Sequence, residues 1–185
     1  GTIKFAQGCG YGNAAYFDSS TGYAFNDNFT DDNETTLTGN FTITMWINGD
    51  DDNKAYSAAY SSGAKTNSNH QIDVDNSDRL RMLYYNTGGT VPGFNQNNIT
   101  DSTPITNGLW YHLAAVHTDT NQWSFYKNGQ LVGTQTAYAS WDKLKIGINR
   151  NTDIRWKGYI DEFKVYGRAF TADNVTNACL LYQEC

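Results

Sequence analysis

The chain has 185 residues, of which 39% are hydrophobic and 15% aromatic, and its formal net charge is −6. This length suffices for one well-buried domain and is short for two. The acidic balance argues against a nucleic-acid partner, which usually requires a basic patch, and against electrostatic docking on anionic membranes. No apolar run in the sequence approaches the roughly 20 residues of a membrane-spanning helix, so we expect no membrane insertion.

Short stretches rich in aromatic and β-branched residues alternate with clusters of Gly, Asn, Asp and Ser, a pattern typical of strands and turns. Residues 86–108 are polar and glycine-rich, and we expect a long loop there. The tail predicts a short helix with Thr171 as its N-cap. The predicted strands cover residues 14–20, 22–27, 40–49, 55–63, 70–75, 79–85, 110–118, 122–136, 143–149 and 158–167.

This succession predicts an all-β fold, a two-sheet antiparallel jelly-roll sandwich with a short C-terminal helix. Neither a linker nor a repeat interrupts the sequence, so we expect residues 1–185 to form a single domain. The chain begins at Gly1 without a signal segment, which favours a processed part of a larger multidomain protein.

The three cysteines, Cys9, Cys179 and Cys185, lie close to the two ends of the chain and lack metal-binding spacing. A disulfide from Cys9 to either of the others would join the two ends, and this is the pairing that we favour. A bridge between Cys179 and Cys185 is the third possibility, and it requires the chain to turn back on itself.

Residues 70–85 alternate polar and apolar side chains around "NSD", which predicts a hairpin with a three-residue loop. In that register Asp73 lies opposite Arg81, and Asp75 lies opposite Arg79. Opposite-charge pairs across two strands contribute about 0.2–1 kcal/mol each. The charges therefore set the register of the hairpin, and its apolar side chains face the core.

The C-terminal half carries "LWYHLAAV", "WSFYKNGQLV", "LKIGIN" and "WKGYIDEFKVYGRAFT" in this order. The series resembles the laminin G-like and concanavalin A-like lectin/glucanase superfamily, in particular its bacterial-type laminin G-like domains. The likeness extends upstream through "AAYFD", "GYAF" and "FTITMWI". It implies a jelly roll that takes ligands on its concave face or in rim loops, but the superfamily includes lectins, adhesive modules and glycosidases.

The resemblance also implies a structural calcium ion. Many members hold one through the Asp of the last strand and through backbone carbonyls near the first strands. These positions correspond to Asp161, with Asp27 and Gly39 as further candidate ligands. The alternative interpretation of Asp161 is a carboxylate that caps a turn or a strand end.

The glucanase branch of this superfamily uses a strand of the form Glu-Ile-Asp-Ile-Glu, and "QIDVD" at 71–75 is similar to it. Gln71 stands at the position of the nucleophile, and an amide cannot form a glycosyl-enzyme intermediate. Residues four apart on a strand are also about 13 Å apart, whereas a retaining pair of carboxylates is separated by about 5–5.5 Å. We therefore predict no catalytic residues and no enzymatic activity.

Candidate binding groups lie on the outward face of the predicted hairpin and in the "INRNTDIRW" loop, residues 148–156. Trp141 lies in a polar connection, which makes it the best candidate for an exposed aromatic ring. An arginine in such a cluster could bind a carboxylate or a sulfate through two hydrogen bonds. The alternative for each charged residue is a surface charge that balances a nearby Asp. The candidate glycan-binding residues are Asp73, Arg81, Tyr85, Trp141, Asn149 and Arg150.

These features predict a non-catalytic, lectin-like carbohydrate-binding module of a secreted or cell-surface protein, with a polysaccharide or a cell-surface glycan as its partner. The alternative is an extracellular protein-interaction or adhesion module that binds a protein receptor. A divergent glycoside hydrolase is the third hypothesis.

Overall fold

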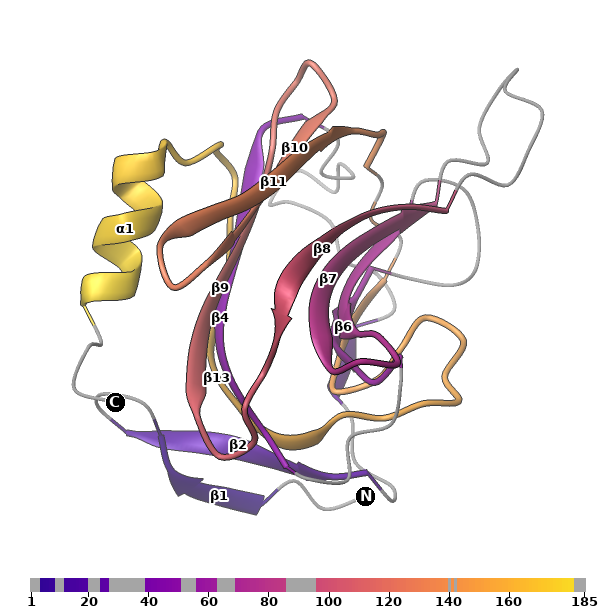
Figure 1. Ribbon diagram of the computed structural model, residues 1–185, viewed down its shortest axis with the longest axis vertical. Coiled ribbons are helices and arrows are strands. Elements are labelled where there is room, and N and C mark those ends of the chain that lie inside the picture. The colour runs from indigo at the N-terminus through magenta and orange to yellow at the C-terminus, as the bar shows by residue number, and fades with distance from the viewer. Residues whose placement is uncertain are drawn as a thin grey trace.

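A computed structural model describes residues 4–8, 12–19, 24–26, 39–50, 56–62, 69–85, 96–139, 141 and 143–181. Two antiparallel sheets pack against each other, and one helix lies beside the larger sheet (Figure 1). The all-β, jelly-roll prediction is confirmed. The elements are β1 (Lys4–Gln7), β2 (Asn13–Asp18), β3 (Ala24–Asn26), β4 (Phe41–Gly49), β5 (Ala58–Ser61), β6 (His70–Val74), β7 (Arg79–Tyr85), β8 (Gln96–Pro104), β9 (Trp110–His117), β10 (Gln122–Lys127), β11 (Gln130–Thr136), β12 (Leu144–Ile146), β13 (Lys157–Tyr166) and α1 (Ala172–Leu180).

The larger sheet has the strand order β1-β2-β13-β4-β9-β10-β11, and the smaller sheet has the order β3-β12-β5-β6-β7-β8. Strand β4 lies in the middle of the larger sheet and is buried along its whole length. Its alternate side chains from Phe41 to Ile47 enter the core between the sheets, where they pack with Ile72 and Met82 of the smaller sheet. Apolar side chains on alternate positions of both sheets therefore form the core.

The opposite face of β4 is buried because helix α1 and the segment before it cover this side of the sheet. Thr42 Oγ1 donates a hydrogen bond to the Arg168 carbonyl oxygen at 2.8 Å, and Trp46 packs against Cys179 of the helix. The predicted N-cap of α1 is confirmed, since Thr171 Oγ1 accepts a hydrogen bond from the Asn174 N–H. Cys179 carries a free, buried thiol.

A bridge that involves Cys179 is therefore absent from this structure. The two other cysteines, Cys9 and Cys185, lie outside the described residues. A disulfide from Cys9 consequently stays a prediction, with Cys185 as its remaining partner.

The predicted hairpin of residues 70–85 is confirmed in its register. Asp73 pairs with Arg81, and the apolar residues of β6 and β7 pair on the other face. Asp75 Oδ2 accepts hydrogen bonds from Arg79 Nε at 2.9 Å and Nη2 at 2.6 Å. The hairpin thus presents a polar face on the side of the sheet away from the core.

The prediction of one long loop over residues 86–108 is wrong for residues 96–104, and residues 86–95 lie outside the described residues. Residues 96–104 form β8, which pairs with β7 at the edge of the smaller sheet. An edge strand needs only one hydrogen-bonded neighbour, and "QNNITDSTP" contains a single large apolar residue, Ile99. Its polar composition conceals the strand, and Pro104 stands at its end, where a missing N–H is tolerated.

Candidate functional site

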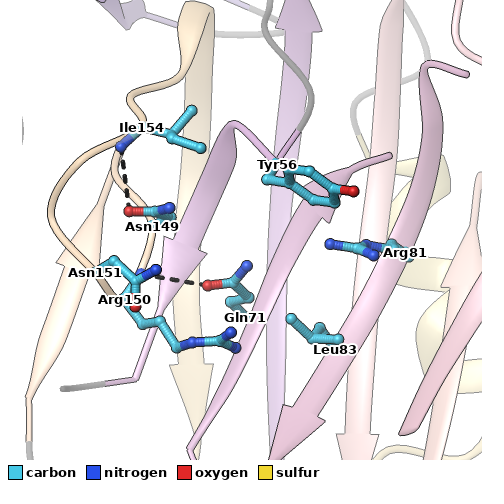
Figure 2. A pocket seen from close by; sticks show the side chains of 8 residues that line it. All are labelled: Tyr56, Gln71, Arg81, Leu83, Asn149, Arg150, Asn151 and Ile154. Carbon is cyan, nitrogen blue, oxygen red and sulfur yellow. Dashed lines mark hydrogen bonds between the residues drawn. The ribbon is translucent and has the colours of Figure 1, made fainter. Parts of the chain in front are cut away.

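A pocket of about 260 Å³ opens on the face of the smaller sheet that points away from the core (Figure 2). Its floor comes from strands β6 and β7, one wall from Tyr56 before β5, and the other wall from the loop between β12 and β13. The lining residues are Tyr56, Gln71, Arg81, Leu83, Asn149, Arg150, Asn151 and Ile154.

The floor is held by a buried ion pair. Arg81 donates from Nε to Asp73 Oδ1 at 2.6 Å and from Nη2 to Asp73 Oδ2 at 2.8 Å, and Gln71 Nε2 donates to the same carboxylate. The Asp73 side chain has 0% exposure and that of Arg81 has 9%. Burial raises the pKa of Asp73 above its usual range, although the hydrogen bonds from Arg81 and Gln71 oppose this shift. The alternation of the two strands brings these three polar groups to one face.

The first wall is the aromatic ring of Tyr56, which is 39% exposed. The Arg81 guanidinium carbon lies 4.8 Å from the centre of this ring, a cation–π distance. Tyr56 adopts a positive φ of 70°, which is costly for a bulky residue, and its N–H donates to the Val74 carbonyl at 2.7 Å. The backbone turn thus directs a partly exposed ring to the edge of the pocket.

The second wall is a loop that its own hydrogen bonds hold in place. Asn149 is buried, and its Oδ1 accepts from the N–H groups of Asp153 and Ile154. Lys145 Nζ donates to the Arg150 carbonyl at 3.1 Å, and the Arg150 N–H donates to Gln71 Oε1 at 3.2 Å. The loop is therefore tied both to itself and to the floor, as the dashed lines in Figure 2 show for two of these contacts.

Arg150 extends from this loop over the sheet (Figure 2). Burial and the nearby charge of Arg81 lower its pKa to about 10, while Asp73 and Asp153 oppose the shift. The guanidinium remains charged at neutral pH because even the lowered value lies well above 7. The pocket is therefore lined by two guanidinium groups, of which that of Arg81 lies against the Tyr56 ring.

The structure brings four of the predicted glycan-binding residues together: Asp73, Arg81, Asn149 and Arg150. Arg81, Asn149 and Arg150 line the pocket, and Asp73 lies beneath it. Asn149 shapes the loop through its side chain. The side chain of Tyr85 lies outside the described residues.

The prediction of Trp141 as an exposed aromatic ring is wrong. Its side chain is 1% exposed and lies in the core between the sheets. The ring centre lies 4.7 Å from that of His70 and 5.5 Å from that of Phe41. The polar neighbours of Trp141 suggested a surface position, but the connection after β11 folds inward, since Ala137 and Ala139 are buried as well.

Sequence reasoning missed Tyr56, Gln71, Asn151 and Ile154 as pocket residues. Tyr56 stands in "AYSAAYSSG", where no pattern distinguishes it from the buried Tyr60. Tyr56 has a positive φ just before β5, and the pairing of β5 with β6 shifts register between Ala58 and Tyr60, so the two rings lie in different environments. Neither feature has a signal in the sequence. Asn151 and Ile154 belong to the predicted "INRNTDIRW" loop, so that loop was the correct region.

Two of the three predicted calcium ligands, Gly39 and Asp161, lie far apart. On β4, Phe41 pairs with His117, whereas Trp46 pairs with both His112 and Asp161. Because Phe41 and Trp46 are separated by five residues of an extended strand, His117 and Asp161 lie about 16 Å apart along β4. The Gly39 carbonyl lies at the His117 end and accepts a hydrogen bond from that imidazole at 2.7 Å. Asp27 lies outside the described residues. Among the described residues, no group of three or more His, Cys, Asp and Glu side chains could hold a metal.

Asp161 instead uses one carboxylate oxygen to accept the Glu162 N–H at 2.8 Å, as the alternative interpretation expected. Its other oxygen lies against Gly8, where any side chain would overlap it. A calcium ion in the protein stays a prediction that this set of ligands does not support.

The strand with "QIDVD" does not present a pair of carboxylates. Asp73 is enclosed by Arg81 and Gln71, and Asp75 accepts hydrogen bonds from Ser77 and Arg79 in the hairpin turn. None of the described residues that line the pocket carries a carboxylate or an imidazole. The described part of the lining thus lacks the two acids that glycoside hydrolysis ordinarily uses.

Comparison with known proteins agrees with this fold. The family model Laminin_G_3, described as the Concanavalin A-like lectin/glucanases superfamily, matches residues 17–176, and the chain belongs to this family. No curated protein matches the sequence.

In the part of the chain that the structure describes, no helix has the length and apolarity to cross a membrane.

Several solved structures share the fold. Domain 4 of AbnA, an extracellular GH43 arabinanase from Geobacillus stearothermophilus, solved with arabinotriose, is 22% identical with a TM-score of 0.70, over 99% of this chain and 82% of that one. The Ruminococcus gnavus IT-sialidase CBM40, solved with alpha2,3 sialyllactose, is 16% identical with a TM-score of 0.67, over 90% and 96%. The botulinum neurotoxin serotype D ligand binding domain, solved with N-acetylneuraminic acid, is 13% identical with a TM-score of 0.72, over 97% and 45%.

Proposed function

We propose that this protein is a non-catalytic carbohydrate-binding module and that the pocket beside Tyr56 is its glycan site. The observation that carries the proposal is one exposed aromatic ring at the edge of a small pocket with fixed polar groups. An aromatic face can stack on the C–H groups of a sugar, while amide and guanidinium groups orient its hydroxyls. The structures of similar fold that were solved with arabinotriose, sialyllactose and N-acetylneuraminic acid support a carbohydrate as the ligand class.

The absence of catalysis belongs to the same proposal. Asp73 is buried in an ion pair, and Gln71 cannot act as a nucleophile. We place the module in a secreted or cell-surface protein with further domains, where it would hold the parent protein on a polysaccharide or a cell-surface glycan.

The proposal is tested by screening the purified protein on a glycan array and measuring the affinity for the best ligand by calorimetry. Tyr56→Ala is expected to weaken binding about 10-fold or more, because the stacking surface is lost. Tyr138→Ala is the matched control, since Tyr138 is 53% exposed and does not line the pocket. Equal affinities for the two variants would contradict the site assignment.

An array without any bound glycan would contradict the function itself. Capture of a protein partner that depends on Tyr56 would then favour the interaction module. Release of reducing sugar from a bound glycan would favour the glycoside hydrolase.

A further inference from the structure

Gln71 lies on the floor of the pocket and uses both polar atoms of its side-chain amide. Nε2 donates to Asp73, and Oε1 accepts from the Arg150 N–H at 3.2 Å, the bond that a dashed line marks in Figure 2. Only 2% of the residue is exposed, so its side chain offers almost no surface to a ligand. The amide therefore connects the floor of the pocket with its loop wall.

The chemistry of the two partners fixes the orientation of this amide. An ionised carboxylate only accepts hydrogen bonds, whereas a backbone N–H only donates one. Asp73 therefore takes the donor of the amide, and the Arg150 N–H takes the acceptor. A methionine side chain of similar length supplies neither group, and an ionised glutamate supplies only the acceptor. Glutamine thus satisfies both partners at once.

The loop between β12 and β13 is anchored at its base and at its tip. The base lies against β5, where Ser61 Oγ donates to the Ile148 carbonyl at 3.1 Å. The tip is held from β12, because Lys145 Nζ donates to the Arg150 carbonyl and to Thr152 Oγ1, both at 3.1 Å. The strand order places β12 and β5 on the same side of β6 and β7. These contacts therefore hold the loop to its own side of the pocket.

Gln71 links the tip of the loop to the opposite side. Its second partner, Asp73, holds Arg81 of β7 through two hydrogen bonds. A continuous series of hydrogen bonds thus runs from the loop through Gln71 and Asp73 to Arg81. Arg81 in turn lies against the Tyr56 ring, with its guanidinium carbon 4.8 Å from the ring centre. The series sets the spacing between the two walls of the pocket.

We propose that Gln71 is a positioning residue of this site: its amide holds the loop wall at the distance from the Tyr56 wall that a bound glycan requires. This inference rests on the proposed carbohydrate-binding function and adds a residue that acts through its neighbours rather than through the sugar. A wall that is already in place needs no ordering when the ligand binds, so less of the interaction energy is lost.

The first test needs no ligand. Amide hydrogen exchange, followed by NMR, measures the protection of the Arg150 N–H that Gln71 accepts. In Gln71→Met, which keeps the length of the side chain and removes both polar atoms, this N–H should exchange at least about 10-fold faster than in the wild type. Gln130→Met is the control, since Gln130 is exposed and does not line the pocket. Equal protection in Gln71→Met and the wild type would overturn the inference.

The second test is glycan binding. An array that includes arabinotriose and α2,3-sialyllactose identifies the tightest-bound glycan, and calorimetry measures its affinity for each variant. Gln71→Met should weaken binding about 10-fold, because the loop wall is no longer held against the floor. Gln130→Met should bind as the wild type does. Thermal melting of each variant establishes that it is folded.

Gln71→Glu distinguishes positioning by hydrogen bonds from a general loss of packing. At about pH 8 the introduced carboxylate lies beside that of Asp73 and has no hydrogen to donate, so binding should be weak. Two adjacent carboxylates hold one shared proton to a higher pH than an isolated one does. Once the pair is protonated, it restores the hydrogen bond to Asp73 and the acceptor for the Arg150 N–H. Affinity should therefore recover towards the wild-type value as the pH is lowered to about 5.

Other charged and titratable side chains surround this position. They are Arg81 on β7, Lys145 on β12, Tyr56 before β5, and Arg150 and Asp153 in the loop. Side chains of these classes do not ordinarily titrate between about pH 5 and pH 8. The wild type and Gln130→Glu, measured at the same two pH values, supply the baseline for the pH effect and for one added negative charge.

The outcomes separate the two proposals. Glycan binding that is lost in Tyr56→Ala and unchanged in folded Gln71→Met would overturn the inference and retain the function. Equal affinities of Gln71→Glu at the two pH values would overturn the role of the hydrogen bond to Asp73. An array without any bound glycan would overturn the function together with the inference.

Discussion

The carboxylate of Asp73 and the guanidinium of Arg81 form a two-pronged ion pair within the smaller sheet, with N–O distances of 2.6 and 2.8 Å. Both groups are almost completely removed from solvent, since the side chains of Asp73 and Arg81 are 0% and 9% exposed. For such a pair, desolvation offsets most of the attraction, whereas the loss of one partner leaves an uncompensated buried charge.

The first prediction concerns this pair. Arg81→Met should lower the free energy of unfolding by about 3–5 kcal/mol, because it leaves the Asp73 carboxylate buried without its cation. The double variant Asp73→Leu/Arg81→Met should recover most of this loss, since neither charge then remains. Urea denaturation of the wild type, of the single variants Asp73→Leu and Arg81→Met and of the double variant measures both effects. A double variant as unstable as the sum of the single ones would show that the two residues act independently.

The second prediction concerns pH and His112. Burial lowers the pKa of His112 from its usual 6.5 to about 4, so the unfolded chain binds this proton more tightly than the folded one. The contribution of the neutral, buried His112 to the free energy of unfolding is therefore complete above pH 6.5. It is lost as the pH falls from 6.5 towards 4, because only the unfolded chain takes up the proton in this range. The loss from this group amounts to about 3 kcal/mol at the lower limit, at about 1.4 kcal/mol per pH unit.

His112→Phe removes this titration and retains a ring beside Trp46, which lies 5.3 Å away. Urea denaturation between pH 7 and pH 4 should give a shallower decline for this variant than for the wild type. The buried His70 and His117, whose pKa values burial also lowers, account for part of the remaining decline. Parallel pH profiles of the two proteins would contradict the role of His112.

The third prediction compares two glycines with nearly the same backbone angle. Gly108 and Gly147 have φ values of 81° and 80°. A methyl group at Gly108 would meet no atom within 4 Å, whereas one at Gly147 would lie 2.3 Å from the Phe17 ring. Gly108→Ala should therefore cost only the left-handed strain of about 1–2 kcal/mol, and Gly147→Ala should cost several kcal/mol. Equal changes in chemical denaturation would show that the Phe17 ring yields readily.

The fourth prediction concerns the thiol of Cys179. Burial raises the pKa of this group, which reduces its thiolate, and the side chain is only 5% exposed. Iodoacetamide should modify Cys179 slowly in the native protein and rapidly in denaturant, as peptide mass spectrometry can measure. The same peptides report whether Cys9 is bridged to Cys185. Rapid native alkylation of Cys179 would contradict its burial between the helix and the larger sheet.

The sequence predicted the main strands and the C-terminal helix because their signals are local. Alternation fixed the hairpin register of residues 70–85, and opposite charges reinforced it, so Asp73 and Arg81 could be paired in advance. The N-cap of α1 was likewise readable from Thr171. Strand β8 was missed because an edge strand with polar side chains has no apolar alternation to reveal it.

The candidate site was predicted in part for the same reason. Arg81 and Arg150 were found because the hairpin face and the polar loop could each be recognised. Trp141 was expected to be exposed because its neighbours are polar, and it is buried; Tyr56 was not a candidate, and its ring is exposed. Sequence context ranks residues by their neighbours along the chain, whereas exposure depends on neighbours in space.

The sequence by itself thus determined the fold class, the family and the pairing of the charged hairpin, since periodicity and short motifs are properties of contiguous residues. Only the tertiary structure decided that the loop after β12 and the ring of Tyr56 form the walls of a pocket whose floor is β6 and β7. It also decided that Asp73 and Arg81 are buried together beneath this pocket. The physical reason is that burial and charge balance are sums over residues that lie far apart in the chain, such as Asp73 and Arg150.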